Sequence, residues 1–143
     1  MHRTMNSSRS WSFVSDRLDD ARPVRRAIRR FLERSADSDL SDLDAAEVIV
    51  GELLANVVRH GAPPFGVCVD WNAERPTLYV SDRGRARKRL LYTAPDHDAE
   101  RGRGLLLVRA LACGAPAIDA RGGTRGGTRV AVTLPVRRTG RAA

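Results

Sequence analysis

The chain has 143 residues and an excess of positive charge, with 25 Lys and Arg residues against 17 Asp and Glu residues, a net charge of +8. This length fits one domain, and a hydrophobic content of 42% can supply its core. No apolar run approaches the roughly 18 residues of a membrane span, and the first ten residues lack the apolar stretch of a secretory signal. Cys68 and Cys113 make no metal-binding spacing. These observations exclude membrane, secreted and disulfide-rich classes, and a cytoplasmic location is expected.

The excess charge lies in three segments of the chain. Residues 1–10 carry +2, residues 85–103 carry +3 and residues 137–143 carry +3, while the rest is neutral. Charged termini are usually solvated, so residues 1–10 and 137–143 are expected to be disordered arms flanking one domain over residues 11–136. The alternative is that these Arg-rich segments bind a polyanion such as nucleic acid.

Apolar spacing predicts the elements of the first half of the chain. Alternation over residues 11–13 predicts a short strand. From Pro23, near the expected helix start, an i, i+3, i+4, i+7, i+8 pattern predicts an amphipathic helix with a basic outer face. Ser41 and Asp44 predict a capping box that opens a second helix, which Gly61 ends. The acidic front half of this second helix would complement the basic first helix if the two pack together.

The second half of the chain is richer in strands. Residues Gly66–Trp71 and Thr77–Ser81 are expected to form a hairpin, and a basic loop of about 20 residues follows. A third helix is expected from about Gly104 to Cys113, with two final strands at 115–121 and 128–134. The order β α α β β α β β predicts an α+β two-layer sandwich, with a mixed or antiparallel sheet and helices on one face.

Two polar residues on the second helix could carry chemistry. Glu52 and Asn56 are four residues apart, so their side chains lie on one face of the helix. The amide oxygen of Asn suits a hard cation such as Mg²⁺, and a carboxylate one turn away could orient a hydroxyl group or a water molecule. Alternatively, each is an ordinary surface residue or is satisfied by a backbone partner.

Asp82 and Gly84 directly follow the strand over residues 77–81. Such a pair is most often a simple turn. Alternatively, the carboxylate can accept a hydrogen bond from an exocyclic amine, and the glycine lets the backbone approach a flat base.

A second glycine-rich segment over residues 101–105 leads into the third helix. It consists of Arg101, Gly102, Arg103, Gly104 and Leu105. Free backbone N–H groups, a helix N-terminus and flanking arginines make this segment a candidate phosphate cradle. The Arg-Gly-Gly steps of residues 121–128 could indicate an RNA-binding segment, but strand patterns flank them and favour a glycine-rich hairpin.

The order and spacing of these features resemble those of the GHKL (histidine-kinase-like) ATPase family, whose domain has the Bergerat ATP-binding fold. The resemblance extends from about Trp11 to Leu134, and within the family the chain resembles the RsbW-like group of small bacterial anti-sigma-factor serine kinases. Its parts are Glu52-x-x-x-Asn56, Asp82-x-Gly84, Gly102-x-Gly104-Leu105 and Gly127-Thr128.

The resemblance implies a role for each of these residues. Asn56 would bind Mg²⁺ that bridges the ATP phosphates, and Glu52 would activate the acceptor hydroxyl. Asp82 would receive the adenine amino group, with Gly84 beneath the base and Thr128 assisting. The segment from Arg101 to Leu105 would hold the phosphates, with Gly102, Arg103 and Gly104 at its centre.

The implied activity is that of a protein serine/threonine kinase that sequesters a sigma factor. It would transfer the γ-phosphoryl group of ATP to a small STAS-type anti-anti-sigma partner. Related domains often pair, so a homodimer is one expectation, whereas a membrane or nucleic acid is not an expected partner. The family often has a second glycine where this chain has Ala86, and the segment after it is unusually basic. Two alternatives therefore stay open: a regulatory module that binds ATP without transferring phosphate, and a nucleic-acid-binding protein that uses its Arg-rich arms.

Overall fold

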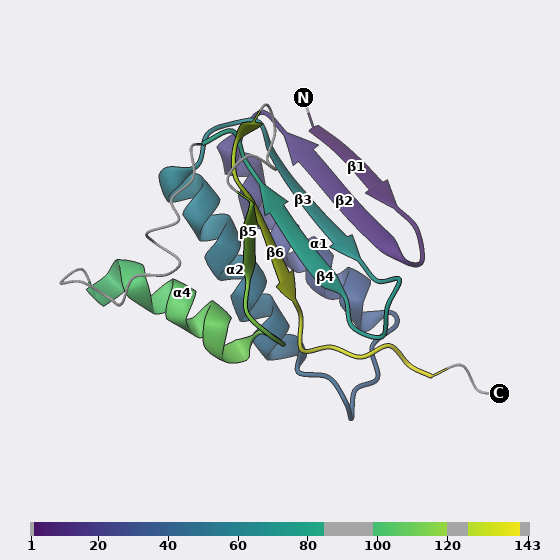
Figure 1. Ribbon diagram of the computed structural model, residues 1–143. Coiled ribbons are helices and arrows are strands. Elements are labelled where there is room, and N and C mark those ends of the chain that lie inside the picture. The colour runs from purple at the N-terminus through teal and green to yellow at the C-terminus, as the bar shows by residue number, and fades with distance from the viewer. Residues whose placement is uncertain (1, 85–98, 120–125, 141–143) are drawn as a thin grey trace.

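The computed structural model describes residues 2–84, 99–119 and 126–140 (Figure 1). Its strands are β1 (His2–Asn6), β2 (Ser10–Ser15), β3 (Phe65–Asp70), β4 (Thr77–Ser81), β5 (Ala117–Asp119) and β6 (Arg129–Thr133). Its helices are the 3₁₀ helix η1 (Leu18–Asp20) and the α-helices α1 (Ala21–Glu33), α2 (Leu43–His60) and α4 (Ala99–Leu111).

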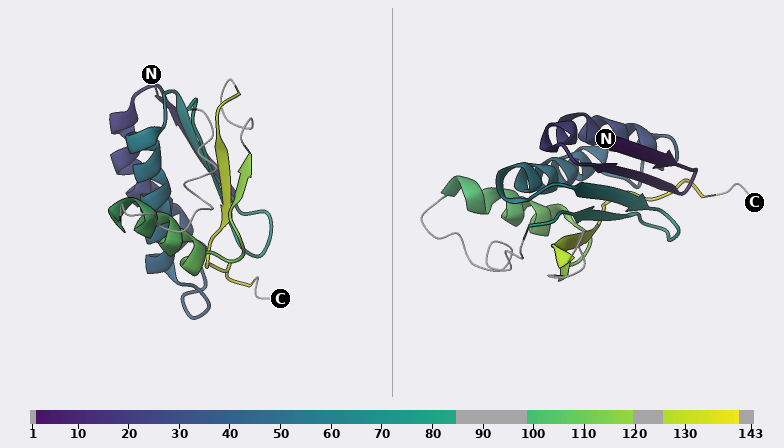
Figure 2. Two further views of the ribbon diagram at one scale, coloured as in Figure 1. Left: turned by 60° about the vertical axis from the view of Figure 1, so that its left-hand side comes forward. Right: turned by 90° about the horizontal axis from the view of Figure 1, so that it is seen from above.

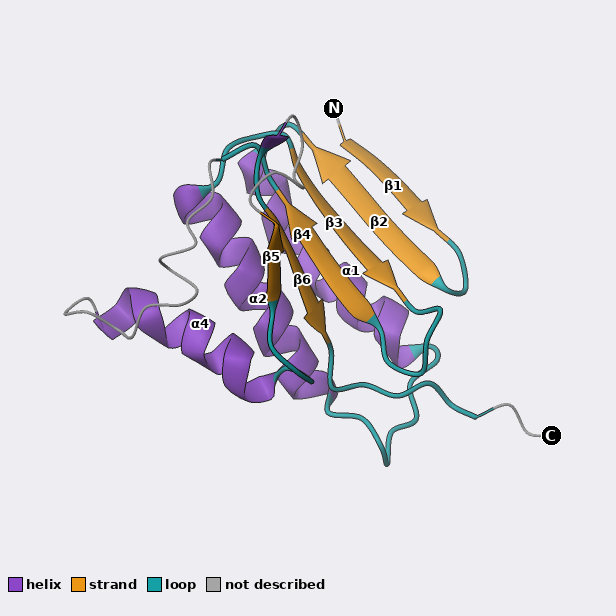
Figure 3. Cartoon of the chain, viewed as in Figure 1, coloured by secondary structure: helices purple, strands orange, loops and turns teal. Residues whose placement is uncertain are grey.

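The strands form one sheet of order β1-β2-β3-β4-β6-β5, in which every neighbouring pair is antiparallel. The three α-helices cover one face of this sheet, with α2 between α1 and α4 (Figures 1 and 2). Figure 3 shows the same separation of helices and strands by colour. The α+β two-layer sandwich predicted from the order of the elements is confirmed, and the expected β3–β4 hairpin is present.

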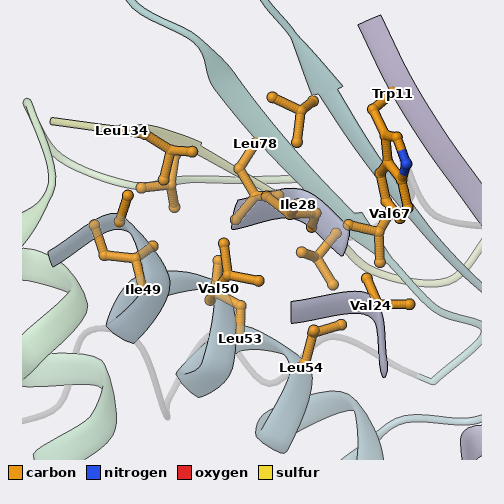
Figure 4. Packing of buried hydrophobic residues seen from close by; sticks show 14 of the residues in the cluster. Trp11, Val24, Ile28, Ile49, Val50, Leu53, Leu54, Val67, Leu78 and Leu134 are labelled. Carbon is orange, nitrogen blue, oxygen red and sulfur yellow. The ribbon is translucent and has the colours of Figure 1, made fainter. Parts of the chain in front are cut away.

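The core lies between the helix layer and the inner face of the sheet (Figure 4). The strands alternate in exposure, so that Phe65, Val67 and Val69 of β3 are buried while the residues between them are less so. Ile28 of α1 and Ile49 of α2 are fully buried against them. Among the described residues, no helix combines the length and the apolar character needed to cross a membrane.

Helices α1 and α2 are joined by ion pairs as well as by apolar contacts. The Arg29 guanidinium donates to Asp44 at 2.7 Å, to Glu47 at 2.6 Å and, within α1, to Glu33 at 2.8 Å. These hydrogen bonds, that to Asp44 above all, raise the pKa of Arg29 above its ordinary value. The predicted complementarity between a basic first helix and an acidic second helix is confirmed at this end of the pair.

The N-terminal segment is not the disordered arm that its charge predicts. Residues His2–Asn6 form β1, which pairs with β2 along its whole length, and Ser7–Arg9 make the turn between them. The His2 ring stacks on Phe13 with 5.8 Å between centroids. Because strand pairing uses backbone groups that every such residue has, polar side chains did not prevent it.

Residues 137–140 of the C-terminal segment are not disordered either. Arg137 donates to Glu74 at 2.6 Å, and Arg138 lies over the Trp71 ring, with its guanidinium carbon 5.4 Å from the centroid. Arg138 also forms a β-bridge with Ala36. The expected disordered tail is therefore corrected for residues 137–140, whereas residues 141–143 lie outside the described residues.

Three helix starts differ from the sequence prediction. Helix α1 begins at Ala21, two residues before Pro23. Helix α2 is capped by Asp42, whose carboxylate accepts from the Ala45 N–H at 2.9 Å, because the Ser41 hydroxyl is instead paired with the backbone of Arg137. Helix α4 begins at residue 99 rather than at 104, so the predicted phosphate cradle lies inside its first turns.

Candidate functional site

Asp82 lies where three segments of the chain meet. One oxygen of its carboxylate, Oδ1, accepts from the Gly84 N–H and from the Ala62 N–H, the latter at 3.4 Å. Its backbone exchanges two hydrogen bonds with Thr128, at 3.0 Å and 3.1 Å, which continue the β4–β6 pairing past the end of β4. The carboxylate is therefore held between the end of α2 and the start of β6.

Small residues make this convergence possible. A Cβ atom at Gly84 would lie 2.7 Å from Asp82 Oδ1, and one at Gly61 would lie 3.0 Å from Asp82 Cγ. At Gly127 it would lie 2.0 Å from the Asp82 backbone oxygen, far inside van der Waals contact. Gly61 has a φ of −80°, so its role is close approach and not an unusual backbone conformation.

Thr128 joins the same cluster through its side chain. Its hydroxyl donates to the Gly84 carbonyl oxygen at 2.9 Å. The structure thus brings Thr128 to Asp82 and Gly84, 44 residues away from Gly84 in the sequence, as the family resemblance implied.

Glu52 and Asn56 lie half-buried on a flank of α2. Glu52 contacts α4, because a Cβ atom at Gly104 would lie 2.1 Å from Glu52 Oε2. At the C-terminal end of α2, Gly61 contacts Asp82. At 1.5 Å per residue, Glu52 and Gly61 are separated by about 14 Å along the helix axis, and Asn56 lies between them. The C-terminal half of α2 therefore runs from the contact with α4 to the Asp82 cluster.

The structure describes the predicted phosphate cradle, residues 101–105, only in part. Residues 101–105 are helical, and Gly104 is packed on Glu52, but the side chains of Arg101, Gly102, Arg103 and Leu105 lie outside what the structure describes. The N–H groups without an intrahelical acceptor belong to the first turn of a helix, and here that turn begins at Ala99. Residues 85–98, Ala86 among them, also lie outside the described residues.

One contributor to the site was missed from the sequence. The Ala62 N–H donates to Asp82, yet its residue type carries no signal, because a backbone donor is present at every residue except proline. Its position directly after the predicted helix end was the one available indication.

The residues present fit a magnesium ion that takes most of its ligands from elsewhere. Within residues 2–84, 99–119 and 126–140, no group of three or more His, Cys, Asp or Glu side chains could hold a metal. Mg²⁺ often has only one or two protein ligands and completes its shell with phosphate oxygens and water. The amide oxygen of half-buried Asn56 suits such a role.

Comparison with protein families finds a match to the histidine kinase-like ATPase domain over residues 14–134. The chain belongs to the histidine kinase-like (GHKL) ATPase family. The matched range contains the flank of α2, the Asp82 cluster and the start of α4. Comparison with curated proteins finds no match for the chain. The family assignment makes the chain an ATP-binding module of the GHKL type and confirms the family and the fold expected from its sequence motifs.

Proposed function

We propose that this chain binds Mg²⁺–ATP along the flank of α2, between the Asp82 cluster and α4, and phosphorylates a protein partner. The observation that carries this proposal is the held carboxylate of Asp82, because two backbone N–H groups fix the orientation of one oxygen. A carboxylate fixed in this way can accept a hydrogen bond from the amino group of adenine. Gly84 lies beside it with no side chain to obstruct a flat base.

The phosphate groups extend from this point along α2 toward α4. Asn56 would hold a magnesium ion, which would supply charge neutralisation for the phosphates. The first turn of α4, which begins at Ala99, would supply N–H groups, and Arg101 and Arg103 would supply positive charge. Positioning and electrostatic stabilisation of this kind account for most of the catalysis in phosphoryl transfer.

Glu52 is placed to serve the transfer step. The serine or threonine oxygen attacks the γ-phosphorus, the bond from that phosphorus to the β–γ bridging oxygen breaks, and ADP leaves. Glu52 takes up the hydroxyl proton. The acceptor is a small STAS-type anti-anti-sigma protein. Once this partner is phosphorylated it leaves the chain, and the chain then binds a sigma factor. A new phosphate at that interface weakens it by repulsion and desolvation.

Titration calorimetry of Mg²⁺–ATP with the full chain tests nucleotide binding. We expect Asp82→Asn to weaken binding by about tenfold or more, because a hydrogen bond to a charged group contributes about 1.5–3 kcal/mol. Asp70→Asn is the matched control. Asp70 also ends a strand and accepts a backbone N–H two residues later, at 3.0 Å, but it lies at the opposite end of the β3–β4 hairpin. Absence of nucleotide binding in the unmodified chain, or equal losses in both variants, would refute the site.

The second candidate function is a regulatory module that binds ATP without transferring phosphate. It is favoured by the close approach of Gly104 in α4 to Glu52 Oε2, which places α4 against one oxygen of the proposed base. Incubation with radiolabelled ATP and each STAS-type protein of the genome that encodes this chain separates the two. A kinase labels one of these proteins, and Glu52→Gln abolishes labelling while it preserves ATP binding in calorimetry. Labelling that persists in Glu52→Gln removes Glu52 from the transfer step, and no labelling of any partner favours the regulatory module.

A further inference from the structure

A groove of about 980 Å³ runs between α1 and α2 on the outer side of the helix layer. The described residues that line it all come from the two helices. The two helices lie side by side in both views of Figure 2. The lined stretch of α1 runs over ten residues, from Ala21 to Arg30, and its ends are about 14 Å apart, or between two and three turns of a helix.

The walls of the groove are strongly basic. Five arginines line it, and none of its described lining residues is acidic. Arg25 is paired with Glu47 at 3.6 Å, and its stem passes 3.2 Å from where a Cβ of Gly51 would lie. Arg22, Arg26, Arg30 and Arg59 form no ion pair with any residue that the structure describes. The acidic residues of α2 neutralise Arg29 at the far end of the helix pair and leave these four without such partners.

The floor of the groove is apolar and small. Gly51, Ala55 and Ala27 keep the helices from filling the space between their outer surfaces, and Val58 leaves 48% of its surface exposed. A chain of phosphates would form ion pairs with the arginines but would make no favourable contact with this apolar floor. An amphipathic segment with acidic and apolar residues on one side would form ion pairs with the arginines and apolar contacts with the floor.

The groove and the proposed nucleotide site occupy opposite flanks of α2. Glu52 and Asn56 lie on the flank toward α4, whereas Gly51, Ala55 and Val58 lie on the flank toward α1. A ligand in the groove therefore does not need to contact the nucleotide. Its binding can be tested independently of the proposed kinase function.

We propose that this groove docks an acidic amphipathic helix of a protein partner, two to three turns long. Its Asp and Glu side chains pair with Arg22, Arg26, Arg30 and Arg59, and its apolar side chains lie on Val58 and Ala55. Such a partner matches the charge, the apolar floor and the length of the groove together.

The test uses the full chain and a designed, fluorescently labelled helical peptide of about 12 residues with Glu on one side and Leu beside it. We expect the peptide to bind and to protect residues 21–30 and 51–59 from hydrogen exchange. Arg26→Glu with Arg30→Glu should weaken binding by about tenfold or more. Arg9→Glu with Arg34→Glu is the matched control, because it makes the same change in net charge at exposed positions outside the groove.

A second pair of variants tests the apolar floor. Val58→Asp should weaken binding strongly, whereas Val48→Asp, at an α2 valine with 39% exposure outside the groove, should not. Asp82→Asn should bind the peptide as the unmodified chain does, so failure of the nucleotide site and failure of the groove remain distinguishable. The proposal is overturned if the peptide does not bind, or if the two arginine pairs have equal effects. It is also overturned if duplex DNA binds more tightly than the peptide and Val58→Asp changes neither the affinity for DNA nor the affinity for the peptide.

Discussion

At Gly127 the backbone of the chain passes so close to the Asp82 carbonyl that no side chain fits between them. The same principle holds at Gly61 and Gly84, where the glycine hydrogen faces the Asp82 carboxylate. These contacts define the site at the scale of single residues. Two N–H groups orient the Asp82 carboxylate, and the absence of side chains at Gly61 and Gly84 allows these segments to come close to it.

Gly127→Ala tests the close approach directly. We expect it to lower the free energy of unfolding by about 1–3 kcal/mol, because the added methyl group must displace backbone atoms of Asp82 and Arg83. Urea denaturation followed by circular dichroism measures this loss. Gly140→Ala is the matched control, since nothing lies within 4 Å of its Cβ position, and it should leave stability unchanged. Equal stability of Gly127→Ala and the unmodified chain would contradict the packing described.

At the scale of elements, α2 carries both of the proposed functions. Its buried residues pack on the sheet, one flank faces α4 and the other lines the groove with α1. The start of this helix is fixed by Asp42, whose side chain satisfies one of the N–H groups that every helix leaves unpaired. The position of every residue on its two flanks depends on that start.

Asp42→Ala should therefore destabilise the protein by about 1 kcal/mol, the usual value for loss of an N-cap. Thermal or urea denaturation measures the change. Asp39→Ala, in the exposed loop just before the helix, removes the same charge without removing a cap and should have little effect. If the two variants lose stability equally, the effect is one of charge and the capping role of Asp42 is refuted.

At the scale of the whole molecule, the chain after β6 ties the two layers together. The backbone of residues 135–139 makes hydrogen bonds with the α1–α2 connection, among them Asp42 N–H to Pro135 O at 2.8 Å and Thr139 N–H to Ser35 O at 2.8 Å. Leu134 and Val136 are fully buried beside it. The base of the helix layer is thus fixed to the sheet at the end far from Asp82.

Much of this architecture could be predicted from the sequence, because periodic burial is a local property. The spacing of apolar residues in α2 and their alternation in β3 and β4 indicated those elements, and the order of short polar and glycine motifs indicated the GHKL family. Boundaries were less certain: Ser41 and Asp42 are both good helix caps, and only the position of Arg137 in space decides between them.

The sequence by itself determined the layers of the fold, the family and the residue types of the site. Only the tertiary structure decided that residues 2–6 add a strand, that Ala62 and Gly127 close around Asp82, and that arginines of α1 and α2 line one groove. The physical reason is the same in each case. These features depend on backbone groups and on distances between segments far apart in the chain. Neither produces a periodic pattern of residue types in the sequence.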